Sequence, residues 1–268
     1  MVEIEQLNKL VSRIPDRAFI GIPPEYSFVP MEMVRALIKK RIRELRVLCV
    51  PIGGLAADLL VGSGCVKSLE AAAVSLGEMG QAPQFTLAAQ EGRIEVIDST
   101  CPAIHTALQA SEKGVPFMPL RGLIGSDLVR YRSDWKVVDD PFDENKGKIV
   151  LIPALQPDFA ILHSPLGDCF GNVWIGKRRE LMTLAHAAKT ALVTVEKITD
   201  KSLLDNEKMA AGTLSNLYVS AMAVVPGGAK PLSLPGSYDC DRSEIHKYSE
   251  LARTDKGFKE FVSQVFLN

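Results

Sequence analysis

Several features that would assign this chain to a common class of protein are missing from its sequence. Its 268 residues carry a formal net charge of −1, so no excess of positive charge favours nucleic acid or an anionic membrane as a partner. No apolar run reaches the ~20 residues that a membrane-spanning helix needs. Residues 1–6 carry acidic side chains where a signal peptide needs a basic region followed by an apolar one. These absences predict a soluble, cytoplasmic protein.

The cysteines and histidines lack the spacing of metal or disulfide sites. The five cysteines are scattered without a CxxC pair, and an odd number does not suit a framework of disulfides. The four histidines are dispersed, and no HExxH motif occurs. We therefore expect reduced, mostly buried thiols and no metal site.

The motifs of three large enzyme classes are absent as well. Neither Gly53-Gly54 nor Gly62-Ser63-Gly64 forms the GxGxxG turn of dinucleotide-binding proteins, and no GxxxxGK[ST] phosphate-binding loop occurs. Ser63 stands between two glycines but lacks the flanking pattern of the GxSxG elbow of hydrolases. The sequence thus supports neither a nucleotide site of these kinds nor a hydrolase of this kind.

What the chain does contain is an alternation of predicted helices and strands. Apolar spacing of three to four residues predicts helices at 3–14, 31–43, 56–62, 83–91, 101–113, 180–189 and 243–266. Short apolar runs predict strands at 17–22, 45–50, 66–75, 94–97, 115–120, 149–152, 159–163 and 191–195, while polar residues 137–148 predict a surface excursion. This order indicates an α/β fold with an open, mostly parallel sheet and helices on both faces. No repeat or linker divides the chain, so we expect one domain over residues 1–268.

Loops rich in glycine or proline follow several predicted strands, at 21–30, 51–55, 76–80 and 122–126. Ligands of open α/β sheets bind outside the carboxyl ends of strands, so these loops are candidates for one shared crevice. The alternative is that the glycines only serve tight turns. Glu78, in the third loop, can accept hydrogen bonds from a ligand or can simply be a solvated acid.

Residues 158–172 form the most informative segment of the chain. An apolar run ends at His163 and passes into a loop that contains Asp168, Gly171 and Asn172. A buried strand that leads into a polar loop delivers side chains to a ligand crevice in α/β proteins. His163 can hydrogen-bond a substrate, or it can be a buried histidine with a structural partner.

These segments together resemble the α subunit of family I coenzyme A-transferases, most of all the glutaconate type. The similarity extends over nearly the whole chain, in family order, and is carried by residues 20–23, 60–67, 76–79, 114–126, 158–172, 194–198, 226–229 and 238–241. The first turn departs from the family, because Gly21-Ile22-Pro23-Pro24-Glu25 replaces the usual Gly-Gly-Phe. In the family this loop helps to close the site over the thioester, so the departure leaves the acyl substrate open.

The resemblance implies that this chain is half of an active site. In the family a glutamate of the β subunit forms the covalent intermediate, and the β-subunit signature Ser-Glu-Asn-Gly is absent here, so no catalytic residue is expected in this chain. The expected partners are a β subunit, in a heterodimer or heterotetramer, and an acyl-CoA as substrate, without a permanently bound cofactor. Expected substrate or CoA contacts are Gly21, Gly53, Gly54, Glu78, Arg121, Gly122, Gly125, Ser126 and His163.

Two other functions stay open at this point. Similar α subunits belong to a hydrolase of steroid breakdown that cleaves a ring on a CoA thioester and lacks the β-subunit glutamate. A chain that kept the fold but lost the reaction would be a non-catalytic acyl-CoA-binding protein. The identity of the partner distinguishes the first two, and turnover distinguishes both from the third.

Overall fold

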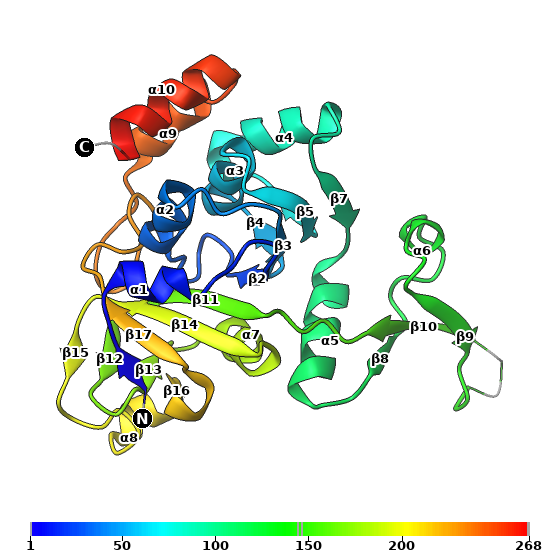
Figure 1. Ribbon diagram of the computed structural model, residues 1–268. Coiled ribbons are helices and arrows are strands. Elements are labelled where there is room, and N and C mark those ends of the chain that lie inside the picture. Colours follow the sequence, from blue (N-terminus) through cyan, green and yellow to red (C-terminus); the bar gives the residue numbers. More distant parts are fainter. Residues whose placement is uncertain (1, 144, 146, 267–268) are drawn as a thin grey trace.

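The computed structural model describes residues 2–143, 145 and 147–266. Its centre is an eight-stranded sheet in the order β1-β17-β14-β11-β2-β3-β5-β7, and every neighbouring pair is parallel (Figure 1). In that order the strands are Glu3–Ile4, Ala221–Val224, Thr190–Val195, Phe159–Ser164, Phe19–Ile22, Leu45–Cys49, Val66–Ala71 and Glu95–Asp98. The predicted open, mostly parallel sheet is confirmed.

The strand order reverses between β2 and β11. From β2 the chain runs outward in one direction, through α2 (Met31–Lys39) to β3, α3 (Leu55–Gly62) to β5, and α4 (Pro83–Gln90) to β7. From β11 it runs in the opposite direction, through α7 (Arg179–Ala187) to β14 and then to β17. Connections diverge at such a reversal, and a crevice opens outside the carboxyl ends of the two strands.

Helices cover both faces of the sheet (Figure 1). On one face, α1 (Leu7–Ser12), α2, α3 and the C-terminal helices α9 (Arg242–Leu251) and α10 (Asp255–Phe266) share a core with alternate strand residues such as Val47. On the other face, α5 (Cys101–Glu112) and α7 share a second core with residues such as Leu48. Val47 and Leu48 are neighbours on β3, so the two cores follow the alternation of side chains along a strand.

A small antiparallel arm projects from the sheet (Figure 1). It consists of β8 (Phe117–Leu120), β9 (Lys136–Asp139) and β10 (Lys148–Pro153), with the short helix α6 (Leu128–Tyr131) between β8 and β9. The segment predicted as a surface excursion, 137–148, is exposed at most of its described residues, and its first residues belong to strand β9. Three of the four residues of β9 are exposed at the edge of the arm, among them Val137.

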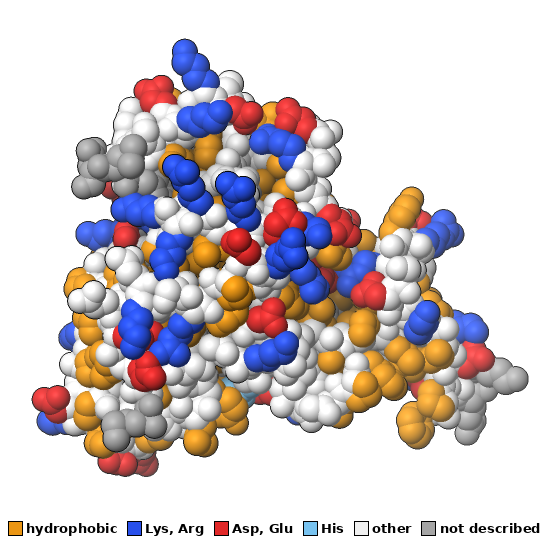
Figure 2. All heavy atoms as spheres, viewed as in Figure 1, with side chains coloured by type: hydrophobic (Ala, Val, Ile, Leu, Met, Phe, Trp, Pro, Cys, Tyr) orange, Lys and Arg blue, Asp and Glu red, His pale blue; other side chains and the backbone are white. Residues whose placement is uncertain are grey.

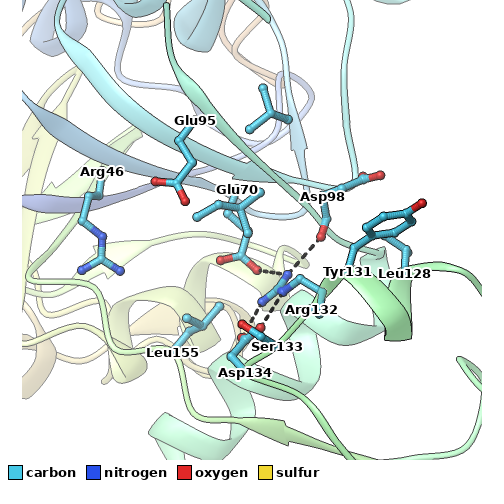
Figure 3. A pocket seen from close by; sticks show the side chains of 12 residues that line it. Arg46, Glu70, Glu95, Asp98, Leu128, Tyr131, Arg132, Ser133, Asp134 and Leu155 are labelled. Carbon is cyan, nitrogen blue, oxygen red and sulfur yellow. Dashed lines mark hydrogen bonds and ion pairs between the residues drawn. The ribbon is translucent and has the colours of Figure 1, made fainter. Parts of the chain in front are cut away.

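A buried ion pair fixes the arm to the sheet. Figure 3 shows Arg132, which follows α6, donating to Glu70 of β5 at 2.8 Å and to the carbonyl of Asp98 at 3.0 Å. Its other nitrogens bond both carboxylate oxygens of Asp134 at 2.9 Å. Removal of one partner of such a pair leaves an uncompensated buried charge. The pair thus sets where the arm lies relative to β5 and β7.

Two small sheets lie beside the main one. One contains β15 (Ile198–Thr199), β12 (Leu166–Asp168), β13 (Val173–Trp174) and β16 (Thr213–Leu214), and the other pairs β4 (Ile52–Gly53) with β6 (Ala73–Val74). The wholly buried Asp168 carboxylate accepts hydrogen bonds from Asn172, from the Phe170 amide and from the Leu203 amide. Asp168 and Asn172 therefore shape the turn after β12. The short helix α8 (Glu207–Ala210) precedes β16.

Three predicted elements have different limits in the structure. Residues 3–14 are not one helix, because Glu3–Ile4 pair with β17 at the sheet edge before α1 begins at Leu7. Residues 66–75 form two strands, β5 and β6, in different sheets. Residues 243–266 form two helices, because Thr254 caps the start of α10 with its side chain and carbonyl. The other predicted helices and strands are present, with ends shifted by a few residues.

Within the described residues, no helix combines the length and apolar character that crossing a membrane requires. The same residues contain no group of three or more His, Cys, Asp or Glu side chains arranged to hold a metal ion. All five cysteines are free thiols.

Candidate functional site at the carboxyl edge of the sheet

The loop after β2 and the end of β11 meet at the point where the strand order reverses. The amide of His163, in β11, donates to the carbonyl of Phe28 in the loop after β2, at 2.8 Å. This bond joins the two diverging connections directly. Side chains that enter from either loop therefore share the crevice that the topology predicts.

His163 belongs to a buried hydrogen-bond network. Its Nε2 lies 2.8 Å from Oε1 of Glu196, which directly follows β14, and its Nδ1 lies 2.8 Å from the hydroxyl of Thr194. The Glu196 carboxylate also accepts from the Gly227 amide at 2.8 and 3.0 Å and from the Tyr238 hydroxyl at 2.8 Å. The Tyr238 oxygen in turn accepts from the Ala229 amide at 3.0 Å. The network fastens residues 227–238 across the ends of β11 and β14.

The network defines the charges of its members. Burial lowers the pKa of His163, against the opposing effect of Glu196, so the imidazole is neutral at pH 7. Its one proton belongs on Nε2, facing the carboxylate, and Nδ1 accepts from Thr194. Burial raises the pKa of Glu196, but the bonds from Gly227, His163 and Tyr238 outweigh it and lower the pKa. Glu196 is thus a fixed anion.

Close packing against His163 explains why residue 228, beside this network, is a glycine. A Cβ on Gly228 would lie 2.5 Å from Cε1 of His163, so any larger residue displaces the ring or the loop. Residues 158–172, 194–198, 226–229 and 238–241, which are distant in sequence and each matched the family pattern, meet here. The sequence pointed to His163, whereas Glu196 and Tyr238 were missed. Their signal was present, because both lie in short segments of the resemblance.

A second carboxyl group lies beside the reversal point, in the loop after β2. Glu25 is partly buried and accepts a hydrogen bond from the amide of Leu55, the first residue of α3. Gly54, just before α3, leaves room for it, since a Cβ at this position would lie 2.0 Å from the Glu25 carboxyl carbon. Burial raises the pKa of Glu25 to about 7, against the Leu55 bond, and the negative Asp58 adds to the rise.

Glu25 lines a cavity of about 400 Å³. Apolar side chains come from Leu76, Met79, Leu232 and Ile245, and polar ones from Glu25, Tyr26, Glu78, Ser233, Cys240 and Arg242. Glu78 and Arg242 form an exposed ion pair at 3.2 Å. The predicted site residue Glu78 therefore lies at this cavity, already paired with a cation.

The structure separates the predicted site residues into groups. Gly53 ends β4, Gly54 lies between β4 and α3 against Glu25, and His163 lies near the end of β11. Gly21 does not lie in a turn: it is inside β2, in register with Leu48 and Ala160, and its Cα faces Leu184 of α7. The loop predicted at 21–30 therefore begins only after Ile22, because the strand continues to that residue.

The remaining predicted residues lie on the arm. Arg121 is exposed and forms an ion pair with Asp140, which follows β9. Gly122, Gly125 and Ser126 lie in the loop between β8 and α6, and Gly125 has a φ of +86° that favours glycine. None of these four lines the cavity around Glu25. The fold is that of an α/β protein, and a cavity lies beside the loop after β2, where the strand order of its sheet reverses.

Comparison with known proteins gives the family. The family model described as "Coenzyme A transferase" matches residues 4–214, and the chain belongs to this family. The A chain of the 3-oxoadipate CoA-transferase of Pseudomonas knackmussii is 26% identical, with 98% of this chain and 93% of that one covered. The cholesterol ring-cleaving hydrolase IpdA subunit of Rhodococcus jostii is 30% identical, with coverages of 87% and 81%. An Archaeoglobus fulgidus protein is 35% identical over 77% of this chain, which spans only 46% of that protein.

Solved structures agree with this assignment. Glutaconate coenzyme A-transferase from Acidaminococcus fermentans superposes with a TM-score of 0.90 at 23% identity, over 99% of this chain and 89% of that one. The decarboxylase AibA/AibB superposes with a TM-score of 0.85 at 26% identity, over 100% and 99%. The fold is that of the CoA-transferases, and the chain is an enzyme subunit of that family.

Proposed function

We propose that this chain is the α subunit of a heteromeric CoA-transferase that moves CoA between an acyl-CoA and a carboxylate. One observation carries the proposal: the 3-oxoadipate CoA-transferase relative, itself one of the subunits of its enzyme, aligns with nearly the whole chain and is covered over 93% of its own length. The two carboxyl groups at this edge, Glu196 and Glu25, are consistent with a nucleophile that lies on the partner subunit. Both oxygens of Glu196 already accept hydrogen bonds, and Glu25 is partly buried with a pKa raised to about 7, so only part of it is anionic at neutral pH.

The exposed surface supports a partner subunit. The arm presents apolar side chains to solvent, as the orange groups on the projecting part of Figure 2 illustrate. Phe117 and Val137 are 46% and 47% exposed, and Phe142 is 94% exposed. Exposed apolar groups gathered in one region commonly mark a protein contact. We expect the β subunit to cover part of this arm.

The chemistry we propose is ping-pong transfer with the nucleophile on the β subunit. A glutamate oxygen of the partner attacks the thioester carbonyl, the C–S bond breaks, and CoA leaves as the thiolate. The thiolate then attacks the glutamyl carbonyl of the resulting anhydride, which releases the first carboxylate and leaves CoA bound to the glutamate. A second carboxylate reverses these steps. This chain contributes walls and hydrogen-bond donors, and a CoA thioester is the substrate with no resident cofactor.

A hydrolase is the second candidate, favoured by one comparison. The IpdA relative is 30% identical, against 26% for the 3-oxoadipate CoA-transferase relative. In this alternative, water cleaves a ring of the substrate, and the CoA thioester is not exchanged with a second carboxylate. The two reactions share the fold and the need for a partner, so they differ in the acceptor and in the partner's nucleophile.

Purification of the tagged chain from its native cell, followed by assay of the recovered complex, tests the proposal. With glutaryl-CoA as donor and acetate as acceptor, we expect acetyl-CoA to form at a rate that depends on acetate. A complex that forms no acetyl-CoA, and whose partner chain lacks the nucleophilic glutamate, contradicts transfer and supports the hydrolase. Recovery of the chain alone, with thioester binding but no turnover, contradicts both and leaves a binding protein.

A further inference from the structure

Glu25 is a carboxyl group on a cavity wall that the network around Glu196 does not use. Its loop follows β2 at the point where the strand order reverses, and the cavity beside it holds about 400 Å³. Ligand sites of α/β proteins are concave, largely apolar, and contain a few placed polar groups. The cavity around Glu25 combines apolar residues, Leu76 and Ile245 among them, with several polar groups.

One carboxylate oxygen of Glu25 accepts a hydrogen bond within the protein, and the other can bond a ligand. Oε1 accepts from the Leu55 amide. Among the described residues, Oε2 has no hydrogen-bond partner, and no lysine or arginine forms an ion pair with this carboxyl. A ligand that covers such an atom removes it from water, which costs free energy unless a ligand atom pairs with it. Oε2 is thus a polar group that the cavity offers to a ligand.

The groups around Glu25 favour its protonated form. Burial raises the pKa of Asp58 of α3 to about 6, against the bonds that it accepts from the Tyr248 hydroxyl at 2.5 Å and from the amides of Gln84 and Phe85. Asp58 is therefore mostly negative at pH 7 and adds to the rise in the pKa of Glu25 there. Arg242 is paired with Glu78. Cys240 and Tyr26 also line the cavity. The pKa of the Cys240 thiol is raised, first by burial and next by the negative charge of Glu25. The described residues that line the cavity therefore supply no free cation to hold Glu25 as an anion.

We infer that Glu25 is an acyl-specificity residue: in its protonated form it donates a hydrogen bond from Oε2 to an acceptor oxygen on the acyl group of the substrate. The inference rests on the proposed function, because it takes an acyl-CoA as the ligand. A carboxylate at the far end of the acyl chain is the strongest acceptor of such a bond. The same carboxylate is repelled once Glu25 is ionised, so recognition of it weakens as pH rises.

The test is a pair of thioesters with acyl chains of equal length. Glutaryl-CoA ends in a carboxylate and pentanoyl-CoA ends in a methyl group, so the ratio of their affinities cancels the titration of CoA itself. We would measure both by calorimetry at pH 6 and pH 8.5 on the complex of this chain with its partner. In the wild type we expect the preference for glutaryl-CoA to fall roughly tenfold between the two pH values, the effect of one charge-assisted hydrogen bond.

Two variants make the test specific. Glu25→Gln keeps an oxygen for the Leu55 amide and a donor for the ligand, so its preference for glutaryl-CoA should be the same at both pH values. Glu207→Gln, an exposed glutamate of α8, should behave as the wild type does. A wild-type ratio that does not change with pH overturns the inference without any variant. A Glu25→Gln profile that matches the wild type overturns it as well.

Turnover in the same preparations separates this inference from the proposed function. If the thioesters bind with the predicted pH dependence but CoA is not transferred, the proposed function fails and the role of Glu25 stands. If CoA is transferred but the ratio of affinities changes neither with pH nor in the Glu25→Gln variant, the role of Glu25 is contradicted and the proposed function stands. If neither thioester binds, both are contradicted.

Discussion

Glu196 and Glu25 lie at the same edge of the sheet, yet their surroundings give them opposite properties. Glu196 accepts hydrogen bonds from an amide, an imidazole and a hydroxyl, and its pKa is lowered. Glu25 accepts one hydrogen bond, faces the negative Asp58, and its pKa is raised to about 7. The difference shows that burial and the number of hydrogen-bond donors together decide the pKa of a carboxyl group at this edge.

The largest effect we expect comes from Glu196→Ala. The substitution leaves the buried His163 and the Gly227 amide without their acceptor, and the unfolding free energy should fall by about 3–5 kcal/mol. Urea denaturation followed by circular dichroism measures the change. A loss below about 1 kcal/mol would mean that the network does not hold residues 227–238 in place.

Glu25→Gln should raise the unfolding free energy, and only at high pH. The folded state holds a proton on Glu25 between pH 4.5 and about 7, whereas the unfolded state has released it, so this group's contribution to stability falls as pH rises through that range. Glutamine removes this cost of roughly 3 kcal/mol. We expect equal unfolding free energies for variant and wild type at pH 4 and a more stable variant at pH 8. Equal stabilities at both pH values would contradict the raised pKa.

Tyr238→Phe should have the smallest effect on the unfolding free energy, and it tests how much one donor to Glu196 contributes. Glu196 loses one of its donors, and the Ala229 amide loses its acceptor, so the unfolding free energy should fall by about 1–2 kcal/mol. Tyr131→Phe is the matched control, because Tyr131 is 83% exposed, and it should be neutral. Equal effects of the two substitutions would show that the Tyr238 hydroxyl has no structural role.

Much of the fold could be predicted from the sequence, because helices and buried strands have distinct apolar periodicities. The strands β3, β11 and β14 and the helices α5 and α7 are apolar enough to identify in this way. The edge strand β1, with two exposed residues, and the strand β9 on the arm could not be predicted, because pairing partners rather than their own sequences define them.

The site was less accessible to prediction than the fold. His163 could be selected because it ends an apolar strand. Glu196 lies in a segment of the resemblance, but its hydrogen bond to His163, 33 residues away, leaves no local pattern in the sequence, so its role required the structure. Glu25 drew attention only as a departure from the family, and its importance depends on burial against α3, which the sequence does not encode locally. The roles of the glycines around it stay predictions.

The central claim is that this chain is half of an active site whose nucleophile lies on a partner. Incubation of the purified complex with glutaryl-CoA, without an acceptor, followed by intact-mass measurement of both chains, tests it most directly. We predict a CoA adduct on the partner chain and an unmodified mass for this one. An adduct on this chain would contradict the account, because it would place the nucleophile here.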